Sequence, residues 1–259
     1  MSGFHKSYYR YTAFLTAPLA TDFSPPPALL REWQSDGIQL KAFLLSGRRV
    51  QMICETTPQI APIKIAQRLK GRLQHHIHKQ LPNAAPFDRD FFLGTLGQND
   101  RRIVTHYIQA QVNKSDLVDP LYRKRLNTLR FHEAPSQPPR GKHCGIHDHF
   151  LHLVFVTHGR YRMFFPEAKK VATSLLDGAT ASGIEIYEFS IMPDHAHILL
   201  RPDHHRSSAQ TLEDLRDASA HILRRTRFWQ SGGYTGTVGP YTMKTALQKT
   251  RDQQGWIAS

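Results

Sequence analysis

The stretch IQLKAFLLSGRRVQMI, residues 38–53, can be laid without gaps on IEIYEFSIMPDHAHIL, residues 184–199. Both copies have the length and the central turn residues of a β-hairpin. The second copy carries His195 and His197 where the first carries Arg49 and Gln51. The chain therefore contains an internal repeat whose copies differ at the positions best able to carry chemistry.

A second pair of segments repeats in the same order. TLGQNDRRIVTHYIQAQ, residues 95–111, lies on TVGPYTMKTALQKTRDQ, residues 237–253. The first copy holds Tyr107, and the second has Lys249 at that position. Each half thus keeps the part of a candidate site that the other half lacks.

The length of 259 residues leaves room for two compact units of roughly 100 to 120 residues each. We expect domains at 1–112 and 149–259, joined by a linker over 113–148 that is rich in proline and mixed charge and holds a short helix near 120–130.

Each half is expected to run strand, helix, hairpin, helix, strand, helix. The segments expected in the first half are 11–15, 27–34, 39–54, 63–80, 91–97 and 101–112. Those expected in the second are 149–156, 166–182, 184–201, 211–229, 234–238 and 241–254. Antiparallel strands covered by helices predict an α+β fold of two ferredoxin-like domains.

The net charge is +13, which favours a polyanionic partner such as DNA, although a merely basic soluble protein has the same balance. The two cysteines, Cys54 and Cys144, lack metal-type spacing and fit a reducing cytoplasm. Since no signal or membrane-spanning segment stands out, we expect a cytoplasmic protein.

His195 and His197 fall in an expected strand, where a period of two puts both imidazoles on one face. Such a pair can bind a metal or a phosphate, whereas a lone histidine there is usually a core residue. Tyr107 and Gln111 are four residues apart on an expected helix and share a face, so a nucleophilic phenol and an amide metal ligand would lie together. The plainer interpretation of a tyrosine there is packing.

The motifs IMPDHAHILL at 191–200, LKG at 69–71 and FFLGTLGQNDRRIVTHYIQAQ at 91–111 resemble the HUH-superfamily single-tyrosine transposases of bacterial insertion sequences. The resemblance is to the IS-two-hundred type, which includes the REP-associated tyrosine transposases. It implies that His195 and His197 hold Mg²⁺ or Mn²⁺ and that Tyr107 attacks single-stranded DNA to form a 5′-phosphotyrosine. Gln111 is then the third metal ligand, with Gln253 as the alternative.

Members of this family are typically homodimers in which the tyrosine helix docks against the partner's histidine strand. A tandem fusion with the losses seen here would keep one complete composite site and would act as a monomeric pseudodimer with a pseudo-twofold axis. The resemblance implies a bacterial, nucleoid-associated enzyme whose substrate is single-stranded DNA that contains a hairpin.

Two basic helices are the expected DNA contacts under this hypothesis, although a solvated charged face would look the same. Their candidate residues are Arg68, Lys70, Arg72, Arg224, Arg225 and Arg227. The alternative function is a non-catalytic, domesticated regulator that binds DNA hairpins on the same scaffold.

Overall fold

The computed structural model describes residues 8–19, 23–114, 119–134, 147–222, 228–231 and 233–257. The elements of the first half are β1 (Arg10–Thr16), α1 (Pro27–Ser35), β2 (Ile38–Ser46), β3 (Arg49–Thr56), α2 (Pro62–Gln80), β4 (Phe91–Leu96) and α3 (Arg101–Lys114). Those of the second half are β7 (Phe150–Val156), α5 (Phe165–Ala181), β8 (Glu185–Ile191), β9 (His195–Arg201), α6 (Ser208–Ile222), β10 (Tyr234–Val238) and α7 (Met243–Ile257). The two halves therefore repeat the expected order.

Each half builds one sheet, in the strand orders β2-β3-β1-β4-β6 and β10-β7-β9-β8-β5. The four principal strands of each sheet pair antiparallel. Both sheets place the hairpin beside the first strand of the half, and the last strand lies on that strand's other side. This is the α+β arrangement of two ferredoxin-like halves.

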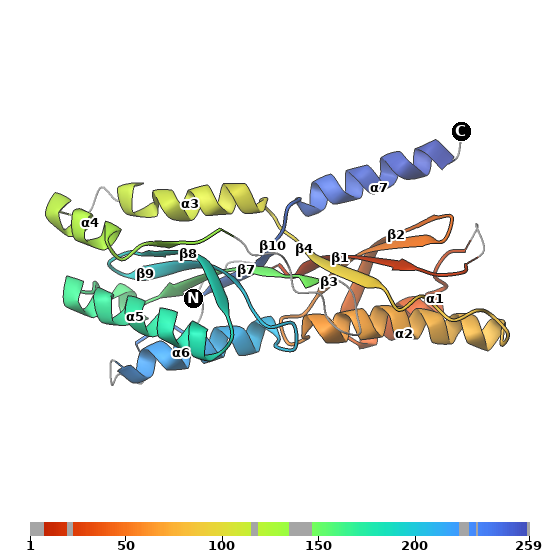
Figure 1. The fold of residues 1–259 in the computed structure, drawn as a ribbon, viewed down its shortest axis with the longest axis horizontal. Coiled ribbons are helices and arrows are strands. Elements are labelled where there is room, and N and C mark those ends of the chain that lie inside the picture. Colours follow the sequence, from red (N-terminus) through yellow and green to blue (C-terminus); the bar gives the residue numbers. More distant parts are fainter. Residues whose placement is uncertain are drawn as a thin grey trace.

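The molecule has three layers (Figure 1). Helices α1, α2, α5 and α6 lie on one side of the sheets, and α3 and α7 lie on the other. Proline at the first helical position starts α1 and α2, where its fixed φ suits the helix and its missing N–H costs no hydrogen bond. Apolar residues at helical spacing then bury one side of α2, including Leu69 and Leu73, against the first sheet.

The third helix of each half crosses to the other half's sheet. Helix α3 packs on β8 and β9, and α7 packs on β2. At the crossing, the N–H of Gly97 donates to the carbonyl oxygen of Tyr241 at 3.2 Å, and the N–H of Arg101 donates to that of Gly239 at 2.8 Å. A Cβ on Gly239 would lie 1.8 Å from the carbonyl oxygen of Thr95, so only glycine allows the two backbones to meet this closely.

The contacts at the crossing are reciprocal. The Thr95 hydroxyl donates to the carbonyl oxygen of Val238, and the Thr237 hydroxyl donates to that of Leu96. Thr95 and Thr237 occupy the same position in the two repeats. Such exchange of equivalent contacts is what a twofold relation between the halves produces.

Four expectations about the elements need correction. The segment between the halves is not only a linker, because β5 (Phe131–His132) joins β8 and β6 (His147–Asp148) joins β4. The β4–β6 pair is parallel, so the sheets are not purely antiparallel. Helix α6 is assigned only to Ile222, and Trp229 forms a bridge with Thr157 instead of ending that helix. Helix α7 begins at Met243, so Tyr241 precedes it.

The short helix expected near 120–130 is present as α4 (Pro120–Asn127), with Asp119 as its N-cap. Its Leu126 joins the core of the second half. Within the described part of the chain, no helix has the length and apolar character needed to cross a membrane. The domain boundaries at 112 and 149 stay a prediction.

Candidate active site

The α3 helix carries Tyr107 across to the second sheet. The Tyr107 ring meets the His197 ring edge-on, with centroids 5.3 Å apart and an interplanar angle of 84°. It is also 6.3 Å from the ring of His152. Tyr107 is 41% exposed, so the helix holds the phenol at the surface and directly beside the histidines.

Apolar packing and one polar contact fix α3 in this position. Val104 and Ile108 pack with Phe150 and Leu199, which face α3 from the second sheet. Gln109 donates from Nε2 to Oε1 of the buried Glu188 on β8, at 2.9 Å. Because a buried carboxylate is costly without a partner, this hydrogen bond ties the helix to one register on the sheet.

The alternation of β9 decides which way its histidines point. Ala196, Ile198 and Leu200 enter the core beneath α5 and α6. His195 and His197 therefore share the opposite face, on which α3 lies. Their ring centroids are 5.1 Å apart. Nδ1 of His195 is 2.6 Å from Oδ1 of Asp194, which orients the His195 ring.

The structure adds a third histidine that the sequence interpretation missed. His152 on β7 places its Nε2 3.2 Å from Nδ1 of His197, and the two rings stack at 19°. The ring of Tyr234 on β10 lies 5.3 Å from that of His152. The only sequence signal was a histidine in an otherwise apolar strand, which usually indicates packing.

Burial keeps the central imidazoles uncharged. It lowers the pKa of His152 to about 4. It also lowers the pKa of His197 to about 2, with smaller contributions from His152 and His195. Burial alone would raise the pKa of Asp194, but the hydrogen bond and charge of His195 and the nearby Arg160 lower it overall. At neutral pH the rings of His152 and His197 are thus uncharged, and Asp194 is a carboxylate.

These features fit a metal ion. Nε2 of His197 is buried and has no hydrogen-bond partner among the described residues. The contact to His152 allows Nδ1–H of His197 to donate, which leaves the Nε2 lone pair available. In the same way, the contact to Asp194 allows Nδ1–H of His195 to donate, which leaves the Nε2 lone pair of His195 available. Metal-ligating histidines usually donate their second N–H to such a group, which fixes the tautomer.

The two glutamines are less clearly placed as metal ligands. Gln111 donates from Nε2 to the backbone carbonyl of Tyr107 at 3.1 Å, so its amide lies along its own helix. The side chain of Gln253 lies outside the described residues. The choice of third ligand stays a prediction.

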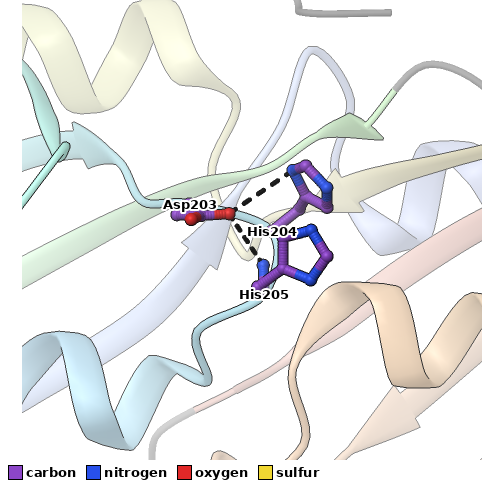
Figure 2. A group of neighbouring side chains, drawn as sticks. All are labelled: Asp203, His204 and His205. Atoms are coloured by element: carbon purple, nitrogen blue, oxygen red, sulfur yellow. Dashed lines mark hydrogen bonds and ion pairs between the residues drawn. The ribbon is translucent and has the colours of Figure 1, made fainter. Parts of the chain in front are cut away.

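A separate group of possible metal ligands lies in the loop after β9 (Figure 2). Oδ1 of Asp203 is 3.5 Å from Nδ1 of His204 and accepts the backbone N–H of His205 at 2.9 Å. The carbonyl of His204 accepts the N–H of Ile63 at the start of α2, on the side of the sheets away from α3. The sequence interpretation did not single out this group, although the adjacent histidines were its signal.

The predicted DNA-binding residues of α2 contact α1 and the loop before β4. Arg68 donates to the carbonyl of Asp36 at 2.8 Å, Arg72 pairs with the Asp36 carboxylate at 3.1 Å, and Lys70 donates to the carbonyl of Asp88. Their role in DNA binding stays a prediction. Arg224, Arg225 and Arg227 lie outside the described residues.

Two solved structures with similar elements are only distantly related to this chain. A protein from Deinococcus radiodurans R1 described as a candidate transposase is 22% identical, with a TM-score of 0.33, over 41% of this chain and 88% of that one. A REP-associated tyrosine transposase bound to a REP hairpin is 11% identical, with a TM-score of 0.31, over 46% and 68%. No curated protein matches the sequence at a significant level.

The sequence model of one family matches both halves, over residues 28–111 and 146–248. That family is described as transposase, IS200-like. The match spans well over half of the sequence and includes Tyr107, His195 and His197. The chain belongs to the IS200-like transposase family.

Proposed function

We propose that the chain cuts and rejoins single-stranded DNA at one site built from both halves, with Tyr107 as the nucleophile. The observation that carries this proposal is the 5.3 Å separation between the rings of Tyr107 and His197. Lys249 takes the tyrosine position in α7, and Arg49 and Gln51 take the histidine positions in β3. A site made within one half alone would lack either the phenol or the imidazoles.

In the proposed step, the phenolic oxygen of Tyr107 forms a bond to phosphorus while the bond from phosphorus to the 3′ oxygen breaks. The proton that Tyr107 gives up ends on the released 3′-OH, and the product is a 5′-phosphotyrosine. Attack by a 3′-OH on that intermediate reverses the step. Since the phosphodiester energy is kept in the intermediate, rejoining needs no nucleotide cofactor.

His195 and His197 would hold the cation, Mg²⁺ or Mn²⁺, with Gln111 or Gln253 as the third ligand. When bound, that cation offsets the negative charge that develops on the phosphate oxygens. His152 would keep the His197 ring oriented, and α3 holds Tyr107 at the exposed edge of the site, where a DNA strand can reach it.

The net charge of +13 supports a DNA substrate, for which we propose single-stranded DNA that contains a hairpin. We further propose that one chain is a complete unit that works as a pseudodimer on DNA in the bacterial cytoplasm. The plainest test is a labelled single-stranded oligonucleotide run with the protein on a denaturing gel.

The wild-type protein should give a covalent band that Tyr107→Phe removes. Tyr234→Phe is the matched control, because Tyr234 is another phenol beside the histidines and should not be the attachment point. DNA binding by the wild-type protein without any covalent band would overturn catalysis and favour the alternative, a non-catalytic hairpin-binding regulator.

A further inference from the structure

The counterpart of the candidate active site lies where α7 of the second half covers the first sheet. Gln51 stands at the position of His197 and Lys249 at that of Tyr107. Gln51 donates from Nε2 to the Thr12 hydroxyl at 3.3 Å, just as His197 contacts His152 at 3.2 Å. The scaffold of the site is thus kept at this counterpart, with Lys249 in place of the tyrosine and with Arg49 and Gln51 in place of the histidines.

The counterpart site is hollow. A pocket of about 970 Å³ opens between α7 and the first sheet, and we call it the α7 pocket. This volume is in the range of pockets that hold small molecules. Among the residues that line it are Phe14, Phe92, Arg49, Gln51, Tyr241 and Lys249.

The walls of the α7 pocket offer exposed aromatic rings. Phe14 is 42% exposed and Tyr241 is 49% exposed, and both line the same pocket. The Phe14 and Phe92 rings are 5.8 Å apart and tilted at 48°. Exposed rings in a cationic groove are the platforms on which proteins stack the bases of single-stranded nucleic acid without reading their sequence.

The charges of the pocket favour a phosphate. Nζ of Lys249 lies 4.1 Å from the centroid of the Tyr241 ring, and neither Lys249 nor Arg49 has an ion-pair partner within the described part of the chain. Of the two carboxylates that line the pocket, Asp148 lies 3.9 Å from Arg101, and Asp252 accepts from the neutral amide of Gln248 at 2.8 Å and keeps its charge. Arg49 and Lys249 beside exposed rings match the phosphate and the base of one nucleotide of a single strand.

We propose that the α7 pocket is a second, non-catalytic binding site for single-stranded DNA, with a base against Phe14 and Tyr241 and a phosphate near Arg49 and Lys249. The proposal rests on single-stranded DNA being the substrate, as proposed above. Helices α3 and α7 lie on the same side of the sheets (Figure 1), so one strand can contact both sites without passing around the molecule. The site whose catalytic residues are replaced thereby holds the strand that is cut at the site of Tyr107.

The test uses the full chain with Tyr107→Phe, which removes covalent attachment, and a single-stranded oligonucleotide that carries photoreactive bromodeoxyuridine. After ultraviolet exposure, we expect crosslinked peptides that contain Phe14 or Tyr241. The added changes Phe14→Ala and Lys249→Ala should each weaken binding of the oligonucleotide by about tenfold, the usual effect of losing one stacking contact or charge pair. Both side chains are exposed, so neither change should unfold the protein.

The matched controls are Phe164→Ala and Lys169→Ala, which remove an exposed ring at the N-cap of α5 and an exposed cation on α5; this helix lies on the opposite side of the molecule. Both should bind like the parent protein. Crosslinks confined to α3, with wild-type affinity in Phe14→Ala and Lys249→Ala, would overturn the α7 pocket and leave the Tyr107 proposal intact. If crosslinks appear at the pocket but the wild-type protein never forms a covalent band, the Tyr107 proposal would be overturned and the α7 pocket would stand.

Discussion

The rings of Tyr107 and His197 meet edge-on, 5.3 Å apart, although the two residues come from opposite halves of the chain. The contact exists because α3 leaves its own sheet at Gly97 and packs on the sheet of the second half. Helix α7 makes the opposite crossing. This crossing of the two helices places Tyr107, His195 and His197 in one site. The residues that replace their counterparts, Lys249, Arg49 and Gln51, lie in the other site.

The histidines should be required for metal binding and cleavage, but not for binding DNA. We expect His197→Ala to abolish the covalent band and to weaken Mn²⁺ binding, measured by calorimetry, because the buried Nε2 is lost. Affinity for single-stranded DNA should change little, because backbone phosphate contacts supply most of it.

The control for that experiment is His76→Ala, since His76 also has a buried, unpartnered Nε2 but lies on α2. It should keep both Mn²⁺ binding and the covalent band. Full cleavage activity of the wild-type protein in EDTA would show that cleavage needs no metal ion.

The composite site should form within one chain. Tyr107→Phe and His197→Ala are each expected to be inactive. Mixed in solution they should stay inactive, because α3 and β9 of a single chain already meet. Recovery of the covalent band on mixing would mean that helices exchange between chains. The proposal that one chain forms a complete pseudodimer would then be wrong.

The crossing of the two halves should depend on glycine. A Cβ at position 239 would lie 1.8 Å from a backbone oxygen, so Gly239→Ala should lower the free energy of unfolding by at least about 2 kcal/mol. Gly71→Ala is the matched control, because position 71 is helical and no atom lies near the place of the added Cβ. Alanine there should raise the free energy of unfolding by about 0.5–1 kcal/mol. Urea unfolding measures both, and equal effects would contradict the close approach.

Stability should fall in alkaline solution because of Cys54. Burial, followed by the charge of Glu55, raises the pKa of this thiol to about 12. The folded chain therefore keeps a proton that the unfolded chain releases above its ordinary pKa, so stability is full below about pH 8.5 and is lost as the pH rises towards 12. The expected slope is up to about 1.4 kcal/mol per pH unit.

Urea unfolding between about pH 7 and 9.5 tests this, because burial also raises the pKa of Tyr11, paired with Cys54 across the sheet, and that phenol adds its effect at higher pH. Cys54→Ala should flatten the slope in that range. An unchanged slope in Cys54→Ala would assign the effect to another group.

Much of the fold could be predicted because the repeat aligns whole structural units. The matched segments 38–53 and 184–199 were both predicted to form hairpins, and the pairs β2–β3 and β8–β9 confirm this. The crossing at the two T-x-G segments was not predicted, because it depends on contacts between residues more than 140 positions apart. The linker strands β5 and β6 could not be predicted, because two-residue strands have no periodicity and exist only through pairing with β8 and β4. The predicted end of α6 at Trp229 was wrong because a tertiary bridge to Thr157 overrides helical propensity there.

The site could be predicted only in part. The complementary losses at positions 49, 51 and 249, together with the family resemblance, predicted that α3 and β9 would meet. The structure brings Tyr107 and His197 together, while their catalytic roles stay predictions. His152 could not be found, since its neighbour His197 belongs to another strand. The aromatic lining of the α7 pocket was missed for the same reason, since Phe14 and Tyr241 come from distant segments.

Cleavage by Tyr107 is tested by finding which residue becomes linked to DNA. The covalent complex formed with a single-stranded oligonucleotide is digested with protease and nuclease, and the modified peptide is sequenced by mass spectrometry. One modified residue is expected, Tyr107, which carries the 5′ phosphate of the cut strand. Attachment to any other residue, or through a 3′ phosphate, would contradict this expectation.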